Sequence, residues 1–303
     1  MRTAVACTWA ALLLLALPPL LLGIVVRVKA IAAGRAGAPL LQGYRDLARL
    51  LRKTPVYSGT TTWVFRAGPI VALAATAAAG CLLPLGAGAA LLAFEGDLVL
   101  FAYLLGLGRF AMMSAALDTG SSFEGMGASR EAAIGSLGEV AVFLVLVTLV
   151  VATGELSLSA IFAGLDAGGG NPALWLAAAA LAAVLLAENA RIPIDDPTTH
   201  LELTMVHEVM ALDHSGPDLA FVEYGAAMKL AVTSALLVGL VWPAAARQPI
   251  ALAGGMIAVA VAIGLVESAM ARLRLPRVKQ YLIGSAALAG VALAAELVLR
   301  GAA

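Results

Sequence analysis

The residues best suited to chemistry are acidic, and they follow directly after an apolar run. The run from Ala173 to Ala187 ends at Glu188, and eight carboxylates but only one arginine lie between Glu188 and Glu223. Carboxylates at the end of an apolar segment can exchange protons or contact a charged partner. Glu188, Asp195 and Glu202 are therefore candidates for ion coupling, while Asp218 and Glu223 are interpreted as surface charges.

Further ionisable residues lie inside other apolar segments. Arg109, Glu139 and Glu267 each interrupt a stretch that is otherwise almost free of charge. A charge in the interior of a membrane is costly, so each such residue is a candidate for a functional site. We add these three residues to the ion-coupling candidates, and the alternative is that they are buried charges that only neutralise one another.

No catalytic, nucleotide or metal site is predicted in this chain. The Gly- and Ser-rich segment 118–131 lacks the lysine of a phosphate-binding loop. The histidines at positions 200, 207 and 214 are seven residues apart, about 10 Å on a helix, which is too far for neighbouring pairs to share a metal. The two cysteines, Cys7 and Cys81, have no cluster-binding spacing, and an iron–sulfur cluster typically needs about four thiolates.

The composition indicates a membrane protein. The 303 residues are 62% hydrophobic and only 13% charged, whereas a soluble domain has about 25% charged residues. The formal net charge of zero gives no basic surface for nucleic acid. The predicted fold class is all-α, a single polytopic membrane domain over residues 1–303. Eight candidate spans are predicted at 3–26, 64–86, 98–117, 131–153, 173–190, 226–243, 251–271 and 279–299.

The distribution of lysine and arginine predicts the orientation. The loops that follow the odd-numbered spans hold 14 of these residues and the opposite side holds three, Arg2, Arg247 and Arg300. Positive residues mark the cytoplasmic side. The basic loop 27–66 and the acidic loop 191–225 are therefore expected in the cytoplasm, with both termini outside and the chain in a prokaryotic inner membrane.

Both long loops are predicted to contain helices. Leucines and Tyr44 recur at helical spacing between Leu40 and Leu51, with arginines between them, which is typical of an amphipathic helix in the membrane interface. This helix either anchors the loop or contacts a soluble partner. In the acidic loop, a helix is expected to begin after Pro197 and to run towards Ala211.

Four segments resemble a known family of membrane subunits. They are RAGAPLLQGYRD at 35–46, LDTGSSFEGMGASRE at 117–131, ENARIPIDDPTTHLEL at 188–203 and ESAMARL at 267–273. The chain is similar over its whole length to subunit 1 of respiratory complex I and to the equivalent subunit of energy-converting nickel–iron hydrogenases and formate hydrogenlyase. The second and fourth segments are closest to the hydrogenase branch.

The resemblance implies roles for individual residues. Arg130 and Glu139 match the family's arginine and membrane glutamate, and Arg130 thereby joins the ion-coupling candidates. Thr198 and His200 stand where complex I has carboxylates, which argues against quinone binding. Residues expected to contact a partner are Arg35, Arg45, Asp46, Arg191 and Asp213.

The function that the resemblance implies is that of an anchoring and ion-coupling subunit. It would link a cytoplasmic hydrogenase or formate hydrogenlyase module to proton or sodium movement, without catalysis or cofactors of its own. Nickel–iron and iron–sulfur centres would lie in partners: large and small hydrogenase subunits and a ferredoxin-like subunit, beside antiporter-like membrane subunits and lipid. The alternatives are a quinone-binding subunit of a complex I-type NADH dehydrogenase and an independent secondary ion transporter.

Overall fold

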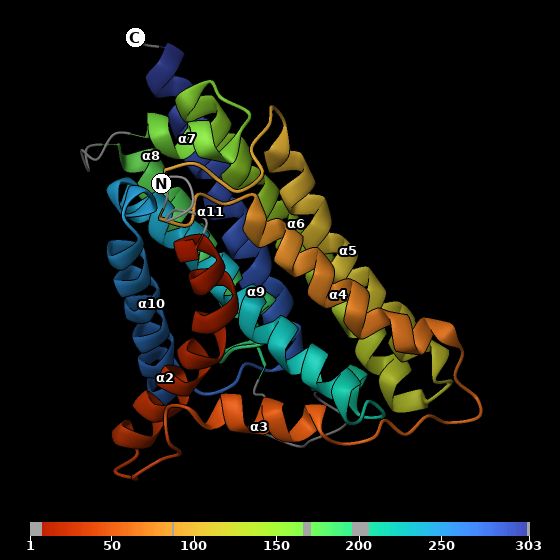
Figure 1. Cartoon of the computed structure of the whole chain (residues 1–303). Coiled ribbons are helices and arrows are strands. Elements are labelled where there is room, and N and C mark those ends of the chain that lie inside the picture. Colours follow the sequence, from red (N-terminus) through yellow and green to blue (C-terminus); the bar gives the residue numbers. More distant parts are fainter. Residues whose placement is uncertain (1–7, 87, 166–170, 196–205, 302–303) are drawn as a thin grey trace.

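The fold is a bundle of long helices with one short helix lying across its end (Figure 1). A computed structural model describes residues 8–86, 88–165, 171–195 and 206–301, and all regular structure within these ranges is helical. The longer helices are α2 (Leu17–Ala32), α3 (Gln42–Leu51), α4 (Trp63–Cys81), α5 (Asp97–Asp118), α6 (Ser122–Thr153), α8 (Pro172–Glu188), α9 (Pro217–Val241), α10 (Pro249–Ala269) and α11 (Leu275–Gly301). Shorter pieces are η1 (Leu12–Ala16), α7 (Leu158–Gly164), η2 (Glu208–Ala211) and η3 (Pro243–Arg247).

Seven helices in the described ranges are long and apolar enough to cross a membrane, one fewer than the eight predicted spans. The remaining segment is α8, an apolar helix of 17 residues, shorter than the roughly 20 residues that a perpendicular span needs. It packs against α6, α9 and α11 inside the bundle. Seven helices of spanning length and the shorter α8 thus correspond to the eight predicted segments.

Two helices begin about nine residues before the membrane spans that were predicted within them. Helix α6 begins at Ser122 and not at 131, after Gly120 with a positive φ. Helix α9 begins at Pro217 and not at 226, directly after Gly216, whose φ of 57° favours glycine. A proline at the first position of a helix is favourable because its missing N–H is not needed there. The Gly- and Ser-rich segment and the end of the acidic loop are therefore mostly helical.

The first span contains a wider turn because of two adjacent prolines. Pro18 and Pro19 have no N–H to donate to the carbonyls one turn earlier, and the five residues of η1 just before them are π-helical. The hydroxyl of Tyr224 on α9 donates to the carbonyl of Leu15 at 2.6 Å, and Tyr44 on α3 donates to that of Ala16. Tyr224 thus takes the place of the N–H that Pro19 lacks, and Tyr44 adds a contact from α3 one residue further along.

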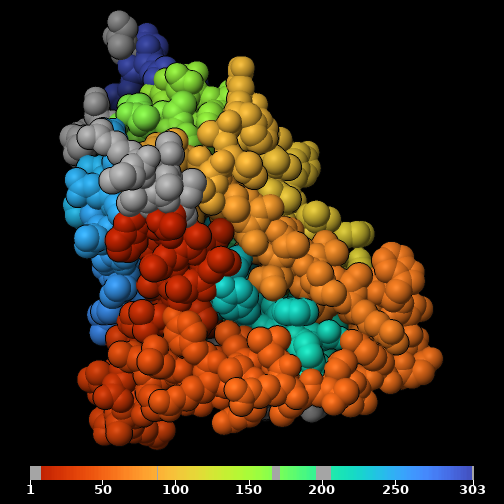
Figure 2. All heavy atoms as spheres, in the orientation of Figure 1, coloured from red at the N-terminus to blue at the C-terminus, as the bar shows by residue number. Residues whose placement is uncertain are grey.

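The predicted amphipathic helix is confirmed as α3, which packs against α2 and α9 across the lower end of the bundle (Figure 1). The segment around α3 forms a continuous band there, with part of α9 visible between it and α4 (Figure 2). The loop after α3 reaches the acidic loop, because Ser215 Oγ accepts from the Val56 N–H at 2.9 Å. The basic and acidic loops thus meet at this end.

The remaining loops meet at the other end of the bundle. Ser159 accepts a hydrogen bond from the Ala90 N–H at 2.8 Å, and Ala246 accepts one from the Gly88 N–H at 3.3 Å. The end of α11 lies at this upper end as well (Figure 1). The odd-numbered and even-numbered loops therefore separate to opposite ends, as the charge distribution predicts.

Labelling of single cysteines should report the orientation. In a background without Cys7 and Cys81, Asp213→Cys should resist a membrane-impermeant maleimide in intact cells, and Glu155→Cys should react. Both side chains are exposed, at the α3 end and at the opposite end respectively. The reason is the excess of lysine and arginine at the α3 end. If Asp213→Cys reacted and Glu155→Cys did not, the orientation would be the opposite of the predicted one.

Candidate functional site

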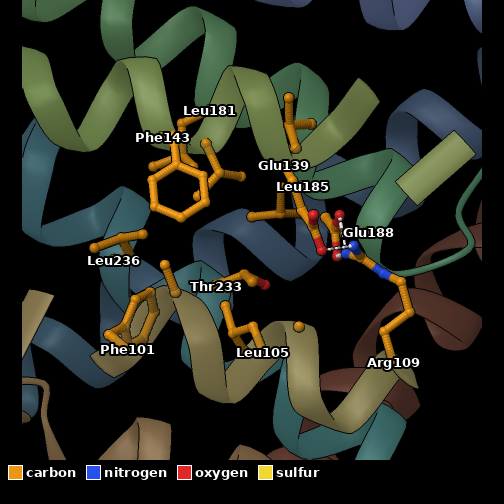
Figure 3. A pocket seen from close by; sticks show the side chains of 14 residues that line it. Phe101, Leu105, Arg109, Glu139, Phe143, Leu181, Leu185, Glu188, Thr233 and Leu236 are labelled. Atoms are coloured by element: carbon orange, nitrogen blue, oxygen red, sulfur yellow. Dashed lines mark hydrogen bonds and ion pairs between the residues drawn. The ribbon is translucent and has the colours of Figure 1, made fainter. Parts of the chain in front are cut away.

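The most prominent polar feature of the bundle is Arg109, which lies midway along α5 and is only 7% exposed. Its Nη2 atom donates to both carboxylate oxygens of Glu188, at 2.6 and 2.7 Å. Its Nη1 atom contacts Glu139, and Nε lies 3.1 Å from Oε1 of Glu131. Glu139 and Glu188 point towards the guanidinium group from two different helices (Figure 3). One buried cation therefore holds three carboxylates.

A second cation balances part of this negative charge. Lys229, which lies on α9, places Nζ 2.7 Å from Oε2 of Glu188. Unpaired buried charges are strongly destabilising, whereas paired and hydrogen-bonded ones are tolerated. Five charged groups from α5, α6, α8 and α9 thus form one connected cluster, the Arg109 cluster: Arg109, Glu131, Glu139, Glu188 and Lys229.

The cluster continues towards the α3 end of the bundle through a histidine. His207 Nε2 lies 3.2 Å from Oε2 of Glu131, and its Nδ1 lies 4.0 Å from Oδ2 of Asp195. Asp195 in turn binds Arg272 at 2.8 Å. Burial lowers the pKa of His207, but the Glu131 carboxylate outweighs burial, so the pKa lies above its ordinary value. An ordinary histidine titrates near neutral pH, and a row of charged groups that contact one another leads from the loops through His207, Glu131 and Arg109 to Glu139.

Glycines on α6 make the space for this cluster. Glu131, Gly135 and Glu139 are spaced four residues apart and share one helix face. A Cβ atom at Gly135 would lie 2.8 Å from Arg109, and one at Gly138 would lie 3.0 Å from a Glu188 carboxylate oxygen. The guanidinium group therefore rests against the backbone of α6, between the two glutamates.

Arg109 separates two cavities. One, of about 140 Å³, is lined by Glu131, His207 and Lys229. The other, of about 30 Å³, is lined by Glu139, Glu188 and mostly apolar side chains such as Phe101 (Figure 3). A space for one water molecule is about 10–15 Å³ on this measure. Both sides of Arg109 have room for water, with more on the His207 side.

Glu267, a predicted ion-coupling residue, belongs to a different network. It is 0% exposed and pairs with Lys29 at 2.8 Å and with Arg191 at 3.7 Å. Burial lowers the pKa of Arg191, although Glu267 opposes this effect. This second network connects α2, α10 and the acidic loop. Arg191, which was predicted to contact a partner, has a mostly buried side chain 3.7 Å from Glu267 in this chain, and a contact with a partner remains a prediction.

The structure places the other predicted residues as follows. Arg109, Glu139 and Glu188 come together, and Asp195 joins them through His207. Arg130, although adjacent to Glu131, lies outside the Arg109 cluster and lines a groove between α6 and α11. Arg35, Arg45 and Asp213 are exposed and Asp46 is half-buried at the α3 end. Glu202 and most of the predicted helix after Pro197 lie outside the described residues; within 206–211, η2 is a short 3-10 helix.

Three members of the site were not among the predicted site residues: Glu131, His207 and Lys229. Glu131 was placed at the start of a span because α6 was predicted to begin there. The spacing of Glu131, Gly135 and Glu139 would have identified the shared face. Lys229 would have followed from the Gly216-Pro217 helix start, which places it about three turns inside α9.

Neutralising Asp195 should have a larger effect than neutralising an exposed acid elsewhere in the bundle. Asp195 is 3% exposed, binds Arg272 and accepts from the N–H groups of Val206 and His207 at 3.1 and 3.4 Å. Asp195→Asn should lower turnover of the assembled complex at low and high salt alike, because buried pairs are poorly screened. Glu155→Gln, an exposed control at the other end of the bundle, should have little effect. Equal, salt-sensitive losses would reduce both acids to surface charges.

Asp218 is unsuitable as such a control. It was predicted to be a surface charge, but it is only 6% exposed at the first turn of α9. The negative charge of its carboxylate favours the protonated form of His214. The ring of His214 stacks on that of Phe65, with the ring centroids 4.0 Å apart. Burial lowers the pKa of His214, against the effect of Asp218 and Asp213. Asp218 therefore belongs to the packed contact between the two loops.

The site contains carboxylates that could bind a metal ion, but each of them is already paired with an arginine or lysine side chain of this chain. Within 8–86, 88–165, 171–195 and 206–301, no three His, Cys, Asp or Glu side chains converge as a metal-binding group. The site as described is a connected network of ion pairs with adjoining water-sized spaces, and such side chains are chemically able to exchange protons.

Comparison with known proteins identifies the family. The family model described as NADH dehydrogenase matches residues 4–298. The chain belongs to this family, whose members are of the complex I subunit 1 type. Among curated relatives, formate hydrogenlyase subunit 4 of Escherichia coli is 32% identical over 301 residues, which cover 94% of this chain and 97% of the relative.

Two further relatives agree with this assignment. Hydrogenase-4 component C of Escherichia coli is 33% identical over 80% of this chain and 76% of its own length. The H-type subunit of the NADH-quinone oxidoreductase of Rubrobacter xylanophilus is more distant, at 29% identity over 65% of this chain and 60% of its length. The family member described here therefore resembles the hydrogenase-type subunits over more of its length.

A solved structure has the same fold. It is a chain of the membrane-bound sulfane sulfur reductase, an archaeal respiratory membrane complex, with a TM-score of 0.82 and 21% identity. The likeness covers 96% of this chain and 99% of that one. The relatives and this neighbour are components of multisubunit membrane complexes, and the resemblance stated from sequence is confirmed.

Proposed function

We propose that this chain is the ion-coupling and anchoring subunit of a hydrogenase- or formate hydrogenlyase-type membrane complex. The observation that supports this most directly is the row of charged side chains from Arg272 and Asp195 through His207 and Glu131 to the Arg109 cluster. It connects the end of the bundle where the basic and acidic loops meet with the interior of the membrane-spanning helices. Redox chemistry would take place in soluble partner subunits.

The coupling step follows from the shared arginine. A change in charge or in conformation at the loops would alter the pairing of Asp195 with Arg272. This in turn would alter the protonation of His207. That change alters the attraction of Glu131 for Arg109, which is also held by Glu139 and Glu188. When one carboxylate loses its charge, the guanidinium group shifts towards the others. Protonation of Glu139 is thus linked to events at the partner subunits.

The α3 end fits a soluble partner. Arg35, Arg45 and Asp213 are exposed there, and α3 has no buried residue of its own. The large and small hydrogenase subunits and a ferredoxin-like subunit, carrying nickel–iron and iron–sulfur centres, would dock on this end. Glu139, whose side chain is 45% exposed at the side of the bundle, would face an antiporter-like membrane subunit, because a carboxylate facing lipid is costly.

The test is to purify the complex by a tag on this chain and to reconstitute it in vesicles. Hydrogen evolution should acidify or alkalinise the lumen, and a protonophore should abolish the pH change. If turnover depended on sodium ions, sodium and not the proton would be the coupling ion. Turnover without any ion movement would contradict the proposal. Ion transport by this chain alone in vesicles would favour the independent transporter.

A second candidate function is quinone binding, which one cavity favours. The space beneath α3 measures about 200 Å³ and is lined by α2, α3 and α9, including Gly23, Gly43 and Glu223. It has a size and an apolar wall suited to part of a quinone head group. Dependence of the purified complex on added quinone, abolished by Gly43→Leu, would support this function.

A further inference from the structure

We propose that the groove between the α3-end termini of α6 and α11 binds the head group of an anionic phospholipid. This groove measures about 480 Å³ and is lined by Ser129, Arg130 and Ala133 from α6 and by Leu275, Pro276 and Lys279 from α11. None of its described lining residues is a carboxylate. The groove is separate from the Arg109 cluster and from the cavity beneath α3.

The polar groups of the groove suit a phosphate. Arg130 and Lys279 approach it from two different helices, and Ser129 adds a hydroxyl. An arginine offers several donors in a fixed plane, and a lysine offers a compact charge, and both are common partners of phosphate oxygens. Two cations placed on opposite walls of one groove bind a phosphate group better than the same cations dispersed over a surface.

The helix surface between the groove and the middle of the membrane indicates a lipid and not a free anion. Residues four apart on a helix share one face, and the row that starts at Lys279 continues with Ile283, Ala287 and Val291, which are all exposed. On α6, the row from Ser129 through Ala133 continues to Ser136 and Val140, also exposed. A head group in the groove would therefore have apolar helix surface directly beneath it for its acyl chains.

Position within the bundle agrees with this occupant. The groove lies at the ends of two membrane-spanning helices, where a head group lies next to the hydrocarbon region. It is on the end of the bundle that carries most of the lysine and arginine. Basic grooves between spans on this side of a membrane are suited to anionic head groups.

The complex in nanodiscs of phosphatidylcholine with a trace of fluorescent phosphatidylglycerol or cardiolipin provides the test. Arg130→Gln/Lys279→Gln should weaken anionic-lipid association roughly 30-fold, about 2 kcal/mol, since each cation contributes about 1 kcal/mol near such lipids. The matched control is Arg274→Gln/Arg277→Gln, which removes two exposed charges of the same end that do not line the groove. The control should retain the association, and so should Arg130→Lys/Lys279→Arg.

Three outcomes would contradict the proposal. Equal losses in both double variants would mean a general attraction to the basic end of the bundle. Displacement of the lipid by inorganic phosphate at matched ionic strength would mean a free-anion site. Association with the isolated chain but not with the assembled complex would mean that a partner subunit covers the groove.

Discussion

Replacing Arg109 with glutamine should destabilise the folded subunit by about 3–5 kcal/mol, the range for breaking a buried ion pair by removing one partner. The change leaves Glu131, Glu139 and Glu188 without their shared cation, and only Lys229 remains beside Glu188. Arg109→Lys should recover only part of the loss, because one ammonium group cannot contact three carboxylates in the geometry of a guanidinium group. Thermal inactivation of the purified complex measures the effect.

The matched control is Arg66→Gln, because Arg66 is exposed and rests over the ring of Tyr57. It should change stability by less than about 1 kcal/mol. The double variant Arg109→Gln/Glu139→Gln should be more stable than Arg109→Gln alone, since among the described residues Glu139 has an ion pair with Arg109 and with no other cation. If Arg109→Gln were as stable as Arg66→Gln, the Arg109 cluster would not be a charged unit.

Replacing Glu139 with glutamine should leave the complex assembled and lower turnover-driven ion movement at least about tenfold, in line with the loss of other proton-transfer groups. The amide keeps the size of the side chain and an oxygen for Arg109, but it cannot change its charge. Glu139 is more exposed than the other carboxylates of the cluster, so the fold depends less on it. A pH-sensitive dye in vesicles measures ion movement, and hydrogen production measures turnover.

Glu95→Gln supplies the comparison, as an exposed glutamate at the other end of the bundle. It should leave both readouts unchanged. A Glu139→Gln complex that moves ions at the normal ratio to turnover would show Glu139 to be only a polar contact of Arg109. A complex that fails to assemble would show a structural role instead.

Much of the architecture could be predicted from sequence because hydrophobic length and positive charge act over whole segments. The α3 helix followed from its leucine spacing, and the separation of the loops followed from lysine and arginine counts. The starts of α6 and α9 could not be predicted as well, because Gly and Ser residues near 120 and acids near 218 suggested loops. Both helices begin beneath other loops, where Glu124 and Asp218 are buried by tertiary contacts.

Part of the candidate site could be predicted, because single charged residues are conspicuous in apolar segments. Arg109, Glu139 and Glu188 were identifiable because each charge stands within or at the end of an apolar run. His207 and Lys229 were not, since the first is near other acids and the second seemed to lie at the edge of a span. The surroundings of Arg130 and Arg191 could not be predicted, because sequence shows which residues are neighbours in the chain, and not towards which helix each side chain points.

The place of Arg109 between two cavities has a consequence for the resting protein. A guanidinium group stays protonated at every physiological pH and has no lone pair that accepts a proton. Protons that reach Glu131 from the His207 side therefore cannot hop across Arg109 to Glu139 while the cation remains between them. If this chain couples ions as proposed, an idle subunit would therefore pass no proton between these two carboxylates, and a gradient made by other enzymes would not leak by this route. The residue that holds the helices together would then also prevent uncoupled proton flow.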